Sequence, residues 1–180
     1  MKISPYFSQL KESYQSEIDD LRFDSEGKDV LNARLTVKRQ LFKELLPMME
    51  IAPEMVAATF HGSITVNDRE QMETFVLEGP GALASWEVVS GSLTVRADLA
   101  PLIGLALTSD GGDEFLVTMA CLQFLFAVQE QTIASEEDED LSIAEEQGDE
   151  QGDEAGDQEA GTDKAEDWLS EHGFDRRNTF

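Results

Sequence analysis

Residues 113–133 read DEFLVTMACLQFLFAVQEQTI, and this stretch decides the fold class. Residues 115–128 are apolar almost throughout, yet this run is shorter than the ~20 residues that a bilayer-spanning helix needs. A helix that is apolar on nearly all sides is typically buried at the centre of a protein. We therefore predict one central helix over residues 113–133 and expect it to be the most buried element of the chain.

Amphipathic helices are predicted around this central helix. Ser4 followed by Pro5 is typical of a helix start, because serine caps the first turn and proline lacks an amide that would be unpaired there. Apolar residues then recur at steps of three and four along much of the chain. The prediction is a mostly α-helical compact domain of about six or seven helices, over residues 5–23, 29–46, from 53 onward, 68–78, 82–89, 99–107 and 113–133.

Residues 60–78 allow two interpretations. Asn67 followed three positions later by Glu70 is a capping-box pattern, which favours a helix over residues 68–78. The β-branched residues of the 64–66 segment favour a short strand, and the interpretation that competes with the helix is a β-hairpin that pairs this strand with residues 74–77. The sequence leaves both possibilities open.

The charges are unevenly distributed along the chain. The 180 residues carry 38 acids and 13 bases, a formal net charge of −25. Residues 1–134 hold 20 acids and 10 bases, whereas residues 135–180 hold 18 acids and 3 bases. Residues 135–161 contain only Leu141 and Ile143 as large apolar side chains, too few to offset the entropy lost on ordering. We predict a helical globular domain over residues 1–134 and a disordered acidic linker over residues 135–161.

Residues 162–180 are predicted to form a short amphipathic C-terminal helix that docks on another surface. Asp163 and Glu166 have capping-box spacing, and Gly173 suits a helix stop. A helix of this length is marginal alone in water, so we expect it to be stable only when docked. Its aromatic and aliphatic anchors are the best candidates for partner binding: Trp168, Leu169, Phe174 and Phe180. Docking in cis on the domain and docking in trans on a partner remain equally open.

Half of the domain's bases lie close together in the sequence. Lys28, Arg34, Lys38, Arg39 and Lys43 fall within sixteen residues. One interpretation is a solvated helix face whose charges balance nearby acids. The other is that Arg34, Lys38, Arg39 and Lys43 form a docking strip for the acidic tail or for another anionic partner.

Residues 111–115 read Gly-Gly-Asp-Glu-Phe, the string that names the GGDEF diguanylate cyclases. In those enzymes the string lies on a hairpin of an α/β nucleotide-binding domain, and a motif carries meaning only in its structural context. Here it precedes the predicted central helix, where Asp113 and Glu114 suit the positive end of the helix dipole. We therefore interpret the match as coincidental and predict no cyclase activity.

Other features of the sequence indicate a protein without a catalytic or metal centre. Cys121 is the only cysteine, so neither an intrachain disulfide nor a zinc-finger site is expected. His61 and His172 are the only histidines and are far apart, and no nucleophile or phosphate-loop motif is present. The N-terminal residues lack the apolar core of a secretory signal. We expect no cofactor, no membrane association and a cytoplasmic location.

Two classes of function fit these observations. The first is a non-enzymatic protein–protein interaction or regulatory protein, in which an acidic tether carries the aromatic docking helix. The second is a nucleic-acid mimic, whose carboxylates occupy the basic groove of a DNA- or RNA-binding protein. We rank mimicry second because most of the net charge follows residue 134 in the predicted linker. Direct binding of nucleic acid is not expected from a chain this acidic.

Overall fold

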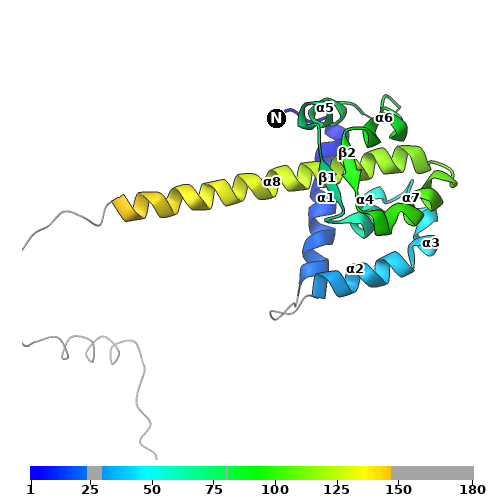
Figure 1. Ribbon diagram of the computed structural model, residues 1–180, viewed down its shortest axis with the longest axis horizontal. Coiled ribbons are helices and arrows are strands. Elements are labelled where there is room, and N and C mark those ends of the chain that lie inside the picture. Colours follow the sequence, from blue (N-terminus) through cyan, green and yellow to red (C-terminus); the bar gives the residue numbers. More distant parts are fainter. Residues whose placement is uncertain (24–29, 80, 147–180) are drawn as a thin grey trace, which may run out of the picture. The chain divides into compact units, whose positions relative to one another are not determined.

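The computed structural model describes residues 1–23, 30–79 and 81–146. The chain divides into two compact units, Met1–Asp138 and Glu139–Phe180, and only the start of the second unit is among the described residues. These residues form eight α-helices, three short 3-10 helices and a two-stranded antiparallel sheet (Figure 1), so the prediction of a mostly α-helical fold is confirmed. The elements are α1 (Pro5–Arg22), α2 (Val30–Gln40), α3 (Phe42–Leu45), η1 (Leu46–Met48), α4 (Pro53–Ala57), η2 (Ala58–Phe60), β1 (Ile64–Val66), α5 (Arg69–Phe75), α6 (Trp86–Ser90), β2 (Leu93–Val95), η3 (Ala97–Leu99), α7 (Ala100–Leu107) and α8 (Gly112–Glu146).

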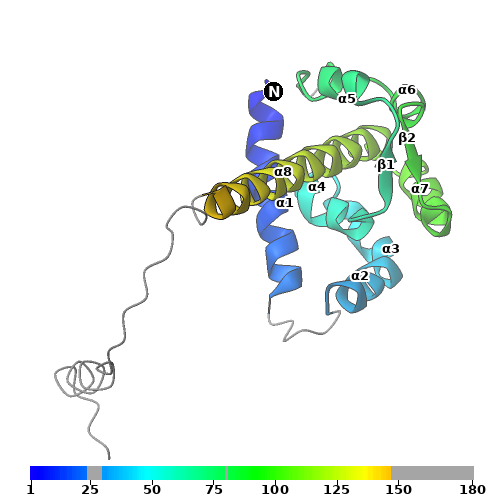
Figure 2. The same cartoon turned by 60° about the vertical axis from the view of Figure 1, so that its left-hand side comes forward.

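Helix α8 is the central element, as predicted. Every residue from Phe115 to Phe126 is buried, including the polar Thr118 and Gln123. Helix α1 crosses α8 in both views of the fold (Figures 1 and 2). This stretch of α8 has no solvent-facing side, so the residues on every side of the helix pack against other parts of the protein. This explains its nearly continuous apolar sequence.

The C-terminal end of α8 differs from the prediction. The backbone is helical to Glu146, whereas the predicted helix ends at residue 133. Residues 134–146 are rich in Glu, which favours helix, and an existing helix extends more readily than a new one forms. The rest of the predicted linker and the whole predicted C-terminal helix lie outside the described residues.

The N-terminal helix begins as the sequence predicts. Ser4 Oγ accepts a hydrogen bond from the amide of Phe7 at 3.4 Å, and Pro5 occupies the first helical position. One face of α1 then buries Phe7, Tyr14 and Ile18. Aromatic rings meet edge to face at the α1–α8 crossing, where the centroids of Tyr14 and Phe126 are 5.7 Å apart.

The predicted helix over residues 29–46 is interrupted in the structure. Helix α2 ends at Gln40, and after Leu41 the chain continues as the single turn α3 and then as η1, which contains Pro47. The predicted end near residue 46 therefore coincides with the change from α-helix to 3-10 helix. A proline lacks the amide needed to continue the α-helical hydrogen bonds.

The structure decides between the two interpretations of residues 60–78. Residues 69–75 form α5, with Asp68 as N-cap accepting from the Gln71 amide at 2.9 Å, so the pairing of residues 64–66 with 74–77 is wrong. The strand at Ile64–Val66 does form, but it pairs antiparallel with Leu93–Val95, in the register Ile64↔Val95, Thr65↔Thr94 and Val66↔Leu93. Both segments contain the β-branched residues Thr and Val, and α5 and α6 lie in the connection between them.

The connection between α7 and α8 brings two backbones into close contact. Gly111 has a φ of +70°, a conformation that suits glycine. A Cβ atom on Gly112 would lie 1.8 Å from the carbonyl oxygen of Ala106, so only glycine fits there. This turn fixes where α8 begins.

Candidate functional site

Arg34, one of the four residues predicted to dock an anion, caps the end of α1. Its Nη1 donates to three backbone carbonyl oxygens at the end of that helix, those of Asp20 at 2.9 Å, Leu21 at 3.2 Å and Phe23 at 3.1 Å. The last carbonyls of a helix have no partner within the helix, and a cation there also complements the helix dipole. Arg34 therefore holds the start of α2 against the end of α1.

The ammonium group of Lys38 also contacts acceptors within the domain. Its Nζ lies 2.6 Å from Glu17 Oε1 on α1 and donates to the carbonyl oxygen of Met55 on α4 at 3.2 Å. Both members of this ion pair are partly shielded, with side-chain exposures of 19% and 25%. Lys38 therefore joins three helices, and it fits the interpretation that the bases balance nearby acids.

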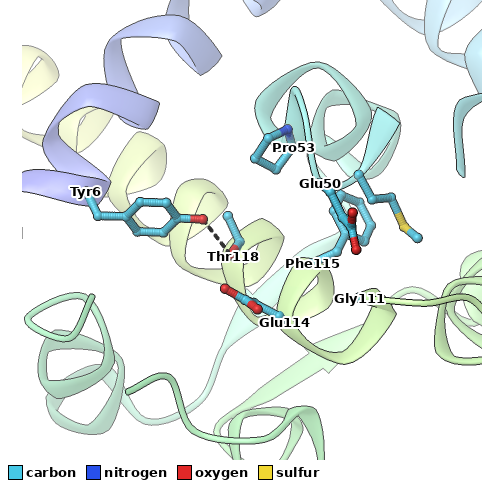
Figure 3. Close-up of a pocket in the computed structure, with 8 residues that line it drawn as sticks. Tyr6, Glu50, Pro53, Gly111, Glu114, Phe115 and Thr118 are labelled. Atoms are coloured by element: carbon cyan, nitrogen blue, oxygen red, sulfur yellow. Dashed lines mark hydrogen bonds between the residues drawn. The ribbon is translucent and has the colours of Figure 1, made fainter. Parts of the chain in front are cut away.

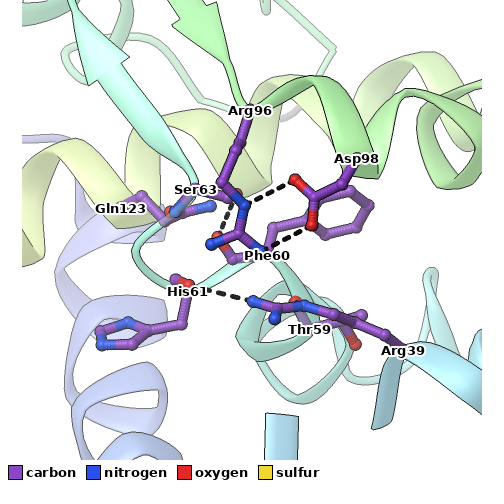
Figure 4. A network of polar contacts seen from close by, with 8 residues as sticks. All are labelled: Arg39, Thr59, Phe60, His61, Ser63, Arg96, Asp98 and Gln123. Carbon is purple, nitrogen blue, oxygen red and sulfur yellow. Dashed lines mark hydrogen bonds and ion pairs between the residues drawn. The ribbon is translucent and has the colours of Figure 1, made fainter. Parts of the chain in front are cut away.

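Arg39 points into the segment that follows η2 (Figure 4). Its Nε donates to the carbonyl oxygen of Thr59 at 3.0 Å and its Nη2 donates to that of His61 at 3.4 Å. Partial burial and the positive charge of Arg96 lower the pKa of Arg39. Arg96 itself is paired with Asp98, with Nε and Oδ1 2.6 Å apart. The Arg39 side chain thus anchors η2 to α2.

The four predicted bases are therefore not equivalent. Arg34, Lys38 and Arg39 all bind acceptors within the domain, while Lys43 is exposed on α3. Docking of the acidic tail stays a prediction, since residues 147–180 lie outside the described part of the chain. For the same reason the structure does not place the predicted anchors Trp168, Leu169, Phe174 and Phe180.

The string at residues 111–115 forms a turn and the first residues of α8, not a hairpin between strands. Asp113 Oδ1 accepts a hydrogen bond from the backbone amide of Trp86 at 3.1 Å and so fixes the start of α6. Phe115 is 3% exposed and belongs to the core. Asp113 and Phe115 thus have local structural roles at the start of the central helix.

A cavity of about 210 Å³ lies beside this helix start (Figure 3). Tyr6 reaches it from α1, Glu50 from the turn before α4, and Glu114 from the first turn of α8. The cavity combines apolar walls with carboxylate and hydroxyl groups. Its lining residues are Tyr6, Met49, Glu50, Pro53, Gly111, Glu114, Phe115 and Thr118.

The cavity is lined by two carboxylates, those of Glu50 and Glu114. Among the described residues, neither Glu50 nor Glu114 belongs to an ion pair, and both side chains are exposed. The hydroxyl groups of Tyr6 and Thr118 lie 3.4 Å apart inside the cavity (Figure 3). Burial raises the pKa of Tyr6, partly offset by the Thr118 hydrogen bond, and the negative charge of Glu114 raises it further. The phenol is therefore protonated and neutral.

Unpaired acids are also the rule elsewhere on the domain. Of the seventeen acids whose side chains the structure describes, four form ion pairs with described bases, namely Glu17, Glu73, Asp98 and Glu130. Most of the nine described bases, by contrast, bind carboxylates or backbone carbonyls within the domain. These are Arg22, Arg34, Lys38, Arg39, Arg69 and Arg96. Among the described residues, acids without an ion pair therefore outnumber bases without one.

The cavity was not anticipated by the sequence analysis. Tyr6 and Thr118 are separated by 112 positions, and Glu50 lies in a turn with no recognisable motif. Nothing in the sequence indicates that these three residues are neighbours.

No cluster of three or more His, Cys, Asp or Glu side chains suited to a metal ion occurs in residues 1–23, 30–79 and 81–132. In the part of the chain that the structure describes, no helix is both long enough and apolar enough to cross a membrane. Comparison with known proteins gives no relative: no protein family, curated protein or solved structure matches the chain.

Proposed function

We propose that this protein is a non-enzymatic interaction protein, whose acidic helical domain binds a protein partner with a basic surface. The observation that carries the proposal is the unequal use of charge in the domain. Six of nine described bases contact acceptors inside the domain, whereas seven of seventeen described acids form an ion pair or accept a side-chain hydrogen bond there.

The excess of negative charge on the domain affects which partners it can bind. A surface of one sign attracts partners of the opposite sign and repels those of the same sign, and so favours both fast association and correct partner choice. The acids of residues 135–180 add to the same field, because that part of the chain carries 18 acids and 3 bases. A basic protein partner is the class that this charge distribution fits.

The segment of residues 162–180 is the second binding element of this proposal. Trp168, Leu169, Phe174 and Phe180 are the anchors that helix-in-groove recognition uses, on a segment joined by an acidic tether. Tethering raises the effective concentration of such an element near whatever the domain has bound. Docking in cis on the domain would make it a regulator, and docking in trans would make it a second contact with the partner.

A reducing compartment, the cytoplasm, is part of the same proposal. Cys121 lies in the core of α8, and burial raises the pKa of its thiol to about 12. A buried thiol of this kind is unreactive, and the chain has no second cysteine with which to form a disulfide.

Nucleic-acid mimicry is the alternative, and one observation favours it. The unpaired carboxylates include residues fixed on helices of the domain, such as Glu70 on α5 and Glu87 on α6, and are not confined to the tail. Mimicry requires carboxylates at fixed positions, because they replace phosphates in a basic groove. Competition with DNA for a basic DNA-binding protein would support this alternative if a chain cut before Ser135 competed as well as the full chain.

The experiment that tests the proposal is an affinity purification with three forms of the chain: full length, cut before Ser135 and cut before Thr162. A captured partner is then purified and its binding is measured at 50 and 200 mM salt. We expect a basic partner, binding that weakens with salt, and retention by the form cut before Thr162, with reduced affinity. A partner held equally well at both salt concentrations would contradict the proposal.

A further inference from the structure

The geometry points to a specific role for the cavity at the start of α8: it receives the ammonium group and aliphatic stem of a lysine side chain from the partner. This inference rests on the proposed function, because it names the group by which a basic protein would be recognised.

The walls suit an aliphatic chain. Met49 and Phe115 are buried core residues that are 3% exposed, and Pro53 adds a third apolar surface. Lysine carries its charge on a flexible four-carbon stem that gains free energy when it covers apolar surface. The rings of Tyr6 and Phe115 also border the cavity, and aromatic faces attract ammonium groups.

The charges suit a cation. Glu50 and Glu114 reach the cavity from separate segments, the turn before α4 and the first turn of α8. The N-terminus of a helix carries roughly half a positive charge, so two carboxylates leave the cavity clearly negative. Glu50 Oε1 also lies beside Gly111, where an added Cβ would be 3.1 Å from that oxygen. Glycine at this position therefore leaves room for the carboxylate at the edge of the cavity.

The hydroxyl groups supply further acceptors in the cavity. Thr118 is 1% exposed, and its hydrogen bond with Tyr6 is long, at 3.4 Å. A hydroxyl oxygen has two lone pairs, so Thr118 and Tyr6 can accept further hydrogen bonds while they contact each other. An ammonium group donates three hydrogen bonds, which matches a set of two carboxylates and a hydroxyl.

A bare metal ion fits this cavity less well than an amine. Calcium takes six to eight oxygen ligands and magnesium an octahedral set, whereas three of the lining residues present apolar side chains. The described residues also contain no cluster of three metal-ligating side chains. Equal binding of calcium at the cavity would therefore contradict the assignment to a lysine side chain.

The test uses the full chain and Nα-acetyl-lysine N-methylamide as the probe, with binding followed by NMR at the resonances of Tyr6, Gly111 and Thr118. The neutral analogue Nα,Nε-diacetyl-lysine N-methylamide controls for the stem alone. The double variant E50Q/E114Q removes both carboxylates of the cavity at constant size. The variant E44Q/E87Q removes the same total charge from exposed sites that do not line the cavity.

We expect saturable shifts at the three reporter residues with the charged probe and none with the neutral analogue. E50Q/E114Q should weaken binding by about tenfold or more, as the loss of hydrogen bonds to a charged group predicts, and E44Q/E87Q by less than about twofold. Equal weakening in both variants, or equal shifts with calcium chloride in place of the amine, would overturn the inference.

Partner capture separates this inference from the proposed function. If the full chain captures a basic partner but does not bind the amine at the cavity, the lysine assignment fails and the proposed function stands. If the amine binds at the cavity but the captured partner binds independently of salt, the proposed function fails instead.

Discussion

The hydroxyl of Tyr14 lies 3.0 Å from Nδ1 of His61. Tyr14 is 0% exposed on α1, and His61 directly follows η2, so this hydrogen bond joins the first helix to the segment that leads into the sheet. The His61 ring also meets Phe126 of α8 edge to face, with centroids 5.0 Å apart. Burial raises the pKa of Tyr14, which keeps the phenol protonated, and Nδ1 of a neutral His61 can accept a hydrogen bond from it.

The first prediction concerns the pH dependence of stability. Burial, and then the positive charge of Arg22, lower the pKa of His61 from 6.5 to about 4. The unfolded chain therefore binds a proton near pH 6.5 that the folded chain does not bind, so stability falls as the pH is lowered from about 6.5 towards 4. Because the ring is partly exposed, we expect His61 to account for roughly 1–2 kcal/mol of this loss.

The measurement is urea unfolding of the wild type and of H61Q at pH 7.5 and pH 4.5. Carboxylates titrate in both proteins, so the difference between their losses isolates the histidine. Identical losses in the two proteins would show that His61 does not hold its neutral form in the folded state.

The second prediction concerns Arg34 as the cap of α1. Arg34→Met keeps the stem but removes the donors to the carbonyl oxygens of Asp20, Leu21 and Phe23, and should lower the free energy of unfolding by about 1 kcal/mol. The exposed Lys43 provides the control, since Lys43→Met should change stability by less than about 0.5 kcal/mol. Urea unfolding at neutral pH compares the two variants. Equal, small effects would mean that Arg34 is an ordinary surface base.

The third prediction concerns the close approach of α7 and α8. Gly112→Ala would place a Cβ 1.8 Å from the carbonyl oxygen of Ala106, and this backbone atom can move only with its helix, so we expect a loss of at least about 2 kcal/mol. Gly104, inside α7, has no atom within 4 Å of an added Cβ, and Gly104→Ala should stabilise by about 0.5–1 kcal/mol. Thermal unfolding of both variants shows whether each substitution raises or lowers stability. A change in the same direction for both would contradict the packing described for this turn.

The sequence predicts the parts of the fold that depend on local pattern. The central helix is evident because an apolar run of this length admits few other structures, and the start of α1 follows from Ser4 and Pro5. The capping-box pattern predicts Asn67 as the N-cap of α5, whereas the structure has Asp68 in that role. Asn and Asp are both good N-caps, so local chemistry does not distinguish between the two positions. The partner of the 64–66 strand could not be found, because it lies beyond two further helices.

The candidate site illustrates a different limit. The sequence shows that the bases cluster in residues 28–43, but it does not show which groups their side chains contact. The acceptors of Arg34 and Arg39 are backbone carbonyls, which every residue possesses. The cavity of Tyr6, Glu50 and Glu114 depends on the crossing of α1 with α8, and no local pattern encodes that crossing.

The most direct test of the central claim, that the domain presents unpaired carboxylates to a basic protein, is the salt dependence of binding between the full chain and its purified partner. The claim predicts that the dissociation constant rises at least about tenfold between 50 and 200 mM salt, because screening shortens the range of the attraction. A dissociation constant that stays the same over this range, or a partner whose binding surface is itself acidic, would contradict it.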